Sequence, residues 1–119
     1  MYLNEIKIIG FAGSNAEPKT IQSGDLVRLD LATQRSWKKK DSKEYESRTE
    51  WHRVVVFGPL TKFAKTLRKG DHLYISGELR YRSYEKQVGN ETVAIPVAEV
   101  HAEDIRRLNA KADSTEGAA

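Results

Sequence analysis

One short stretch of the sequence, residues 49–58, carries two aromatic side chains and an arginine at alternating positions. The stretch is rich in β-branched and aromatic residues and ends in a Gly-Pro pair, a composition typical of a β-strand. Side chains alternate between the two faces of a strand, so Trp51, Arg53 and Phe57 are predicted to share one face. Flat rings beside a guanidinium suit unpaired nucleobases, because rings stack on bases while the cation meets phosphates. The strand alone leaves open a second interpretation, in which both aromatics belong to the core.

Two further segments interleave basic and aromatic residues. Around Trp37 lie Arg35, Lys38, Lys39, Lys40, Lys43 and Arg48, and beside Tyr81 and Tyr84 lie Arg80 and Arg82. The net charge of +3 is a weak indicator of a polyanionic partner. The interleaving is a more specific sign of a surface for nucleic acid.

The residue types and their spacing give little indication of catalysis. The three histidines, His52, His72 and His101, are scattered and lack the spacing of metal ligands, and there is no cysteine. The sequence also lacks a glycine-rich phosphate loop and a nucleophile motif. We therefore expect no enzymatic activity, no catalytic residue, no metal site and no cofactor, with His72 and His101 as surface residues.

The composition is that of one folded domain. The chain has 119 residues, of which 39% are hydrophobic and 31% charged. No apolar run approaches the roughly 20 residues of a membrane span, and the N-terminus lacks the features of a signal peptide. Together with the absence of cysteine, this predicts a cytoplasmic protein without a membrane partner.

Hydrophobic alternation predicts five strands, over residues 3–10, 26–33, 49–58, 73–84 and 92–100. Leu60, Phe63, Ala64 and Leu67 have helical spacing and predict one short helix after Pro59. Gly77 predicts a bulge or sharp bend, and Pro96 an edge position or a bulge. Residues 14–24 are predicted as a loop, residues 37–50 as an exposed loop or extended hairpin, and residues 85–91 as a hairpin tip. One helix between the third and fourth strands is the order of the OB-fold, a five-stranded Greek-key barrel whose exposed face binds oligonucleotides.

The sequence resembles the bacterial-type single-stranded DNA-binding proteins, known as SSB. The matching stretches are Leu29–Thr33 leading to Ser36-Trp37, Thr49–Gly58, Leu67–Gly70 and Tyr74–Arg82. The resemblance runs from about Leu3 to Leu108. It implies an all-β OB-fold domain over residues 1–108, which binds and protects single-stranded DNA without sequence preference in replication, recombination and repair.

The resemblance also implies roles for individual residues. Bases would stack on the aromatics Trp37, Trp51, Phe57 and Tyr84, and phosphates would meet Lys38, Lys40, Arg53, Lys69, Arg80 and Arg82. The family usually has tryptophan at the position of Tyr84 and often lysine at that of Pro59. His52 would lie at a subunit interface of a homotetramer, with a dimer as the fallback.

The C-terminal residues depart from the family pattern. The family commonly ends in an acidic tip that recruits repair enzymes, whereas this sequence ends with Ser114–Ala119. Recruitment through such a tail is therefore not supported, and residues 109–119 are predicted as a short flexible tail. The alternative function is a primosomal or RNA-binding accessory protein on the same barrel. Retention of Trp37, Trp51 and Phe57 argues against a module that has lost base stacking, and a preference for DNA over RNA stays open.

Overall fold

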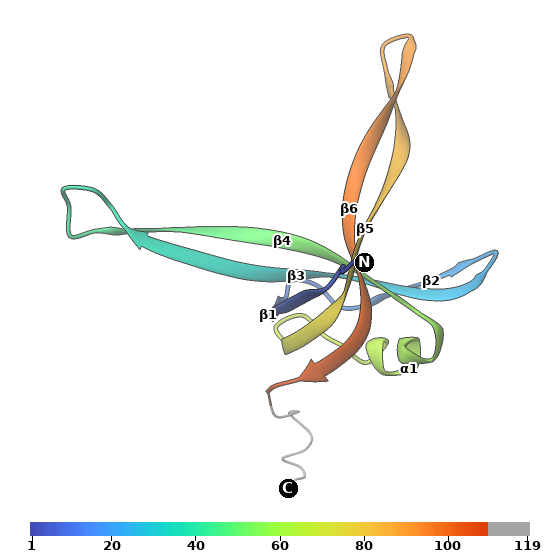
Figure 1. Ribbon diagram of the computed structural model, residues 1–119, viewed down its shortest axis with the longest axis horizontal. Coiled ribbons are helices and arrows are strands. Elements are labelled where there is room, and N and C mark those ends of the chain that lie inside the picture. The colour runs from blue at the N-terminus through green and yellow to red at the C-terminus, as the bar shows by residue number, and fades with distance from the viewer. Residues whose placement is uncertain (110–119) are drawn as a thin grey trace, which may run out of the picture.

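The computed structural model describes residues 1–109 of the chain. Its elements, in chain order, are β1 (Ile6–Ala12), β2 (Glu17–Ile21), β3 (Gly24–Lys38), β4 (Tyr45–Phe57), the 3-10 turn η1 (Gly58–Leu60), α1 (Thr61–Ala64), β5 (His72–Val88) and β6 (Glu91–Arg107). All six strands belong to one sheet (Figure 1).

The sheet closes on itself. Its strand order is β1-β5-β6-β4-β3-β2, and β1 also pairs with β3, so five strands form a ring and β2 extends it on the outside. Every pairing is antiparallel except that of β4 with β6, where Val54 lies opposite Val100. This closure confirms the predicted all-β OB-fold.

Alternating side chains fill the inside of the barrel. Val27, Leu29 and Leu31 of β3 point inward and are buried, as are Val54 and Val56 of β4. The core also includes Leu73 and Ile75 of β5, Val100 and Ile105 of β6, and Ala64 and Leu67 at the helical end. The apolar residues that recur at every second position of the sequence are therefore the ones whose side chains the barrel buries.

The helix is shorter than predicted. Only Thr61–Ala64 is α-helical, after the 3-10 turn that begins at Gly58 and contains Pro59. The following amides of Thr66 and Leu67 bond to carbonyls three residues earlier, so the chain tightens into 3-10-type turns. These turns still deliver Leu67 to the core, which is why its spacing looked helical.

Two long hairpins project from the barrel in different directions (Figure 1). The β3–β4 ladder continues to the pair Lys38–Tyr45, and the β5–β6 ladder to Val88–Glu91. The predicted extended hairpin over residues 37–50 is confirmed, whereas β5 and β6 run further than predicted. The radius of gyration, 17.5 Å, reflects these arms, since a compact 100-residue domain has about 13 Å.

Three other features test the sequence reasoning. Residues 14–24 were expected to be loop, but β2 pairs there with β3; all its side chains are exposed, so it has no apolar alternation to reveal it. Pro96 pairs only with Ser83 of β5, on the edge of β6 that β4 does not reach, as predicted. Asn109, the first residue of the predicted flexible tail, is instead hydrogen-bonded: its side-chain oxygen accepts a hydrogen bond from the backbone N–H of His72 at 2.8 Å.

The remainder of the predicted tail, residues 110–119, lies outside the described residues. Within residues 1–109, no helix is long and apolar enough to cross a membrane.

The predicted bulge in β5 is confirmed at Gly77. The register with β6 shifts between Ser76 and Gly77. A Cβ atom added at Gly77 would lie 2.0 Å from the carbonyl oxygen of His101, so only glycine allows the two strands to approach this closely.

Replacing Gly77 with alanine should therefore lower the free energy of unfolding by about 1–3 kcal/mol, the usual cost of forcing an extra carbon into a packed site. Urea unfolding measures the change. Ser83→Ala, on the exposed arm of the same strand, is the control and should be nearly neutral. An unfolding midpoint for Gly77→Ala equal to that of the parent chain would contradict the close approach.

Candidate nucleic-acid interface

The outer face of β4 bears the two aromatics that the sequence singled out. Trp51 is 62% exposed and Phe57 42%, whereas Val54 and Val56 of the same strand are fully buried. The interpretation that places both rings in the core is therefore excluded. The strand period puts Arg53 on the same outer face, between the rings.

Trp51 lies in a shallow hollow next to β1. The hollow is lined by Ile9 and Phe11 of β1 and by His72 of β5. Phe11 and His72 stack with their ring centroids 4.5 Å apart, and Gly13 leaves room for the indole, since a Cβ there would lie 2.1 Å from the ring. Part of the Trp51 ring thus lies against Gly13, while the residue as a whole stays 62% exposed.

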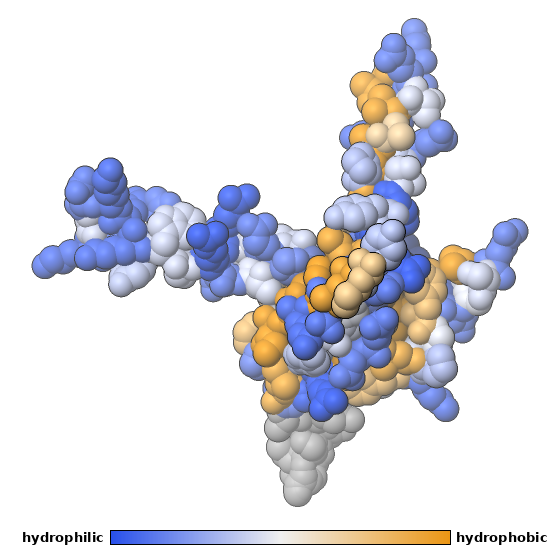
Figure 2. All heavy atoms as spheres, in the orientation of Figure 1, coloured by the Kyte–Doolittle hydropathy of each residue, from blue (hydrophilic) through white to orange (hydrophobic). Residues whose placement is uncertain are grey.

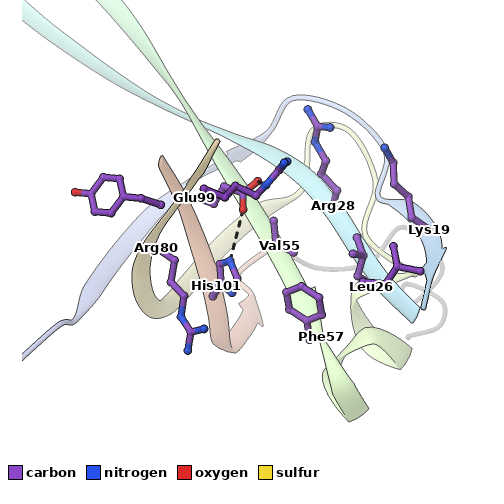
Figure 3. A pocket seen from close by; sticks show the side chains of 11 residues that line it. Lys19, Leu26, Arg28, Val55, Phe57, Arg80, Glu99 and His101 are labelled. Atoms are coloured by element: carbon purple, nitrogen blue, oxygen red, sulfur yellow. Dashed lines mark hydrogen bonds and ion pairs between the residues drawn. The ribbon is translucent and has the colours of Figure 1, made fainter. Parts of the chain in front are cut away.

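Phe57 lies in a separate groove between the barrel and the β5–β6 arm (Figure 3). Leu26 and Val55 form part of its apolar lining, and the ring of His101 lies 5.3 Å from that of Phe57. The cations that line this groove come from three strands and are Lys19 of β2, Arg28 of β3, and Arg80 and Arg82 of β5. The groove therefore combines two exposed aromatic residues, Phe57 and Tyr81, with a basic wall, a combination suited to single-stranded nucleic acid.

A buried carboxylate organises one side of the groove. Glu99 is 3% exposed, and its Oε2 accepts a hydrogen bond from Nε of Arg82 at 2.9 Å. Its Oε1 lies 3.5 Å from Nε2 of His101. Arg80 is paired separately, with Glu78 at 2.8 Å.

The arms carry the other predicted stacking residues. Trp37 is 39% exposed on the β3–β4 arm, with the guanidinium of Arg35 6.0 Å from its ring, and Lys38 and Lys40 lie near the same turn. Tyr84 is 45% exposed on the β5–β6 arm. Figure 2 shows that the β3–β4 arm is covered mostly by hydrophilic residues. The predicted aromatics are therefore spread over both arms and the barrel rather than gathered in one pocket.

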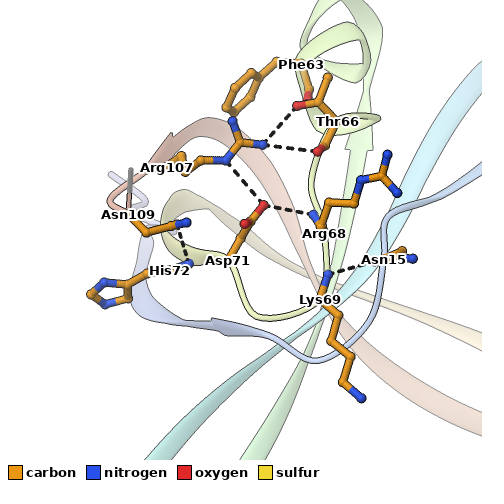
Figure 4. Close-up of polar contacts among 9 residues, drawn as sticks. All are labelled: Asn15, Phe63, Thr66, Arg68, Lys69, Asp71, His72, Arg107 and Asn109. Carbon is orange, nitrogen blue, oxygen red and sulfur yellow. Dashed lines mark hydrogen bonds and ion pairs between the residues drawn. The ribbon is translucent and has the colours of Figure 1, made fainter. Parts of the chain in front are cut away.

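Lys69 belongs to a different region, the loop before β5 (Figure 4). Its backbone N–H donates to Asn15 at 2.9 Å, and the neighbouring Asp71 pairs with Arg107 at 3.3 Å. The guanidinium of Arg107 also lies 5.5 Å from the ring of Phe63. These contacts fix the loop, while the ammonium of Lys69 extends away from them and does not line the Phe57 groove.

The predicted phosphate-binding cations fall into two groups. Among residues 1–109, Arg80 and Arg82 form ion pairs with glutamates, whereas Lys38, Lys40, Arg53 and Lys69 form none. A phosphate that binds Arg80 or Arg82 must compete with a glutamate carboxylate, whereas a phosphate that binds one of the other four cations need not. These four cations are therefore the more available phosphate ligands.

His52 lies on the face of β4 opposite Trp51, as predicted. It is half-buried at the base of the β3–β4 arm, and its Nε2 is 2.9 Å from the hydroxyl of Thr33.

Among the polar residues that line the Phe57 groove, sequence reasoning missed Lys19, Arg28, Glu99 and His101. Arg28 alternates with buried residues, so its outward direction was readable, but its place opposite Val55 required the strand register. His101 was expected to be a surface residue without a role. It is instead half-buried, with 24% of its side chain exposed, against Phe57.

A closed five-stranded barrel with exposed aromatics, a basic groove and long hairpins defines an oligonucleotide-binding barrel. The model of the Single-strand binding protein family matches residues 3–108, nearly the whole chain. The protein therefore belongs to the single-strand binding protein family.

Individual relatives agree. "Single-stranded DNA-binding protein 1" of Xylella fastidiosa (strain 9a5c) is 35% identical over 114 residues, which cover 94% of this chain and 82% of that protein. A Plasmodium falciparum SSB complex with ssDNA has a TM-score of 0.77 at 28% identity, covering 92% of this chain and 97% of that one. A deletion mutant of the single-stranded DNA-binding protein from Thermus aquaticus has a TM-score of 0.70 at 27% identity. This alignment covers 90% of this chain and 51% of the Thermus chain.

Proposed function

We propose that this chain binds single-stranded DNA without sequence preference and protects it during replication, recombination and repair. The observation that carries the proposal is the exposure of Trp51 and Phe57 on the outer face of a barrel strand whose inner face is buried. Membership of the single-strand binding protein family and the likeness to an SSB complex with ssDNA support it. The role is a binding role, without a catalytic step, and we place it on nucleoid DNA in the cytoplasm.

Base stacking would supply much of the affinity. Trp37, Trp51, Phe57 and Tyr84 each present an exposed ring, and stacking is indifferent to base identity because every base has a π-face. A duplex would be rejected, since its bases are already stacked on one another. Tyr84 has a smaller ring than tryptophan, so its contribution should be the smaller one.

Phosphate contacts would supply the rest. Lys38, Lys40, Arg53 and Lys69 are available without breaking an ion pair in the described part of the chain, while Arg80 and Arg82 would exchange or share a carboxylate. None of these contacts reads a base edge, so affinity should vary little with sequence. Because the sites lie on both arms and on the barrel, the strand must wrap around the protein to reach them all.

Assembly into a homotetramer, with a dimer as the fallback, is the second part of the proposal. His52 is proposed to lie at a subunit contact. Several barrels would also extend the basic and aromatic surface along which the strand wraps.

The stacking prediction concerns Trp51→Ala. Because the ring is mostly exposed, the variant should keep its stability while its affinity for oligo-dT falls by about 1–3 kcal/mol, a range already known for single-strand-binding OB folds rather than obtained from this structure. Fluorescence titration measures the affinity and thermal melting the stability. Tyr2→Ala, which removes an exposed aromatic outside the strands, is the control. The proposed role of Trp51 would be overturned if the variant unfolds and oligo-dT does not quench the tryptophan fluorescence of the unmodified protein.

The electrostatic prediction concerns Arg53→Ala. Log affinity for oligo-dT should fall linearly with log salt, with a slope of about −0.7 per phosphate neutralised on a single strand. Arg53→Ala should make this slope shallower by the contribution of about one phosphate contact, whatever the base sequence of the strand. Arg106→Ala, an exposed arginine paired with Asp104, serves as the charge-matched control. Equal affinity for single strand and duplex at the same ionic strength would reduce the protein to a general polycation and contradict the proposed function.

The assembly prediction is tested by sedimentation equilibrium at micromolar protein. The expected species has four times the 13.5 kDa mass of the chain. His52→Glu should shift the distribution to smaller species, because the half-buried site leaves a new carboxylate little room to reach water. Lys62→Glu on the exposed face of α1 should not. A single 13.5 kDa species of the unmodified chain would exclude the assembly.

A further inference from the structure

His101 occupies a position in the Phe57 groove that the proposed function does not yet use. It lies on β6 opposite Val55 of β4, and its ring is tilted by 36° to that of Phe57 at 5.3 Å. Both rings line the same groove (Figure 3). A base that stacks on Phe57 would therefore lie next to the imidazole.

The charged groups around His101 come from β6 itself and from β5, β3 and β2, but not from β4. On β6 itself, Glu99 Oε1 is 3.5 Å from Nε2, and the other oxygen of Glu99 is already bound by Arg82 of β5. Glu78 of β5 lies opposite His101 in the ladder but is paired with Arg80. The groove-lining residues of β4 are apolar, and the remaining cations in the groove are Arg28 of β3 and Lys19 of β2.

Nε2 of His101 lies 3.5 Å from Oε1 of Glu99, whereas Nδ1 forms no hydrogen bond within residues 1–109, and 24% of the side chain is exposed. A protonated imidazole donates through both nitrogens, so it can meet Glu99 and one further anion at once. The four cationic side chains that line the groove would attract a phosphate of a bound strand, so a phosphate is the anion expected beside His101.

We propose that His101 is a further DNA-binding residue, whose protonation adds a phosphate contact beside Phe57 and tightens the binding of single-stranded DNA below neutral pH. The inference rests on the proposed function. Histidine is suited to this role because it changes its charge between about pH 5 and 8. The arginines and lysines of the groove keep theirs throughout that range.

The experiment measures the affinity for oligo-dT by fluorescence anisotropy at pH 5.5 and pH 8.0 and constant ionic strength. Oligo-dT is chosen because neither thymine nor the phosphodiester titrates in this range. The unmodified chain should bind about tenfold more tightly at pH 5.5, the gain of one charge-assisted hydrogen bond. Its salt slope should be steeper at pH 5.5 by about 0.7, one phosphate contact.

Three variants separate charge from packing. His101→Gln should lose the difference between the two pH values. His101→Phe should lose it too, although it keeps a ring against Phe57. His101→Arg carries its charge at both pH values, so it should bind tightly at pH 8.0 and show no response. Thermal melting at each pH establishes that the variants compared are folded.

Glu103→Gln is the matched control. Glu103 is an exposed residue of the same strand, β6, and does not line the groove of Phe57. This variant should keep the full pH response, which separates the effect of His101 from the general effect of carboxylate protonation.

The outcomes distinguish the inference from the proposed function. If the unmodified chain binds oligo-dT but its affinity is the same at both pH values, or if His101→Gln responds as the parent does, the role of His101 is overturned and DNA binding stands. If no form binds oligo-dT at either pH, the proposed function itself fails and the inference falls with it.

Discussion

The burial of alternate residues in a closed barrel is the constraint on which the rest of the structure depends. β4 must place Val54 and Val56 inside, where they meet β3, β6 and the helical end. The period of two then forces Trp51 and Phe57 outward, whatever their own preference for water. The exposure of the rings therefore follows from the burial pattern of the whole strand, because a register shift of one residue that buried them would move the apolar side chains out of the core. Stability of the barrel and exposure of the proposed stacking surface are two consequences of one pattern.

The arms are built differently from the barrel. Beyond the barrel, β3 with β4 and β5 with β6 form two-stranded ladders whose side chains are almost all exposed. Such ribbons have no core of their own, and isolated hairpins are only marginally stable in water. They persist because their strands are continuous with strands held in the barrel. A bound strand or a second subunit lying along an arm would add the contacts that the ribbon lacks, which fits the placement of Trp37 and Tyr84 there.

Most of the fold was predictable because its signals are local. The alternation of β3 and β4, the bulge at Gly77 and the edge position of Pro96 follow from residues within one strand. β2 was missed because an exposed edge strand buries nothing and so leaves no apolar pattern. The groove resisted prediction for a different reason. Lys19, Arg28 and His101 are brought to Phe57 by pairings between strands far apart in the sequence, and no pattern within a strand encodes that register.

Glu99 shows how a binding surface of like charges is kept in order. Cations that converge on a groove repel one another, and their side chains are mobile when solvated. A buried carboxylate between Arg82 and His101 offsets that repulsion and holds both groups in position, at the cost of removing its own charge from water. That cost is acceptable only while cations surround it. The same carboxylate would repel phosphate if it were exposed, so its burial beneath the arginine is what allows an acidic residue to lie within a basic groove.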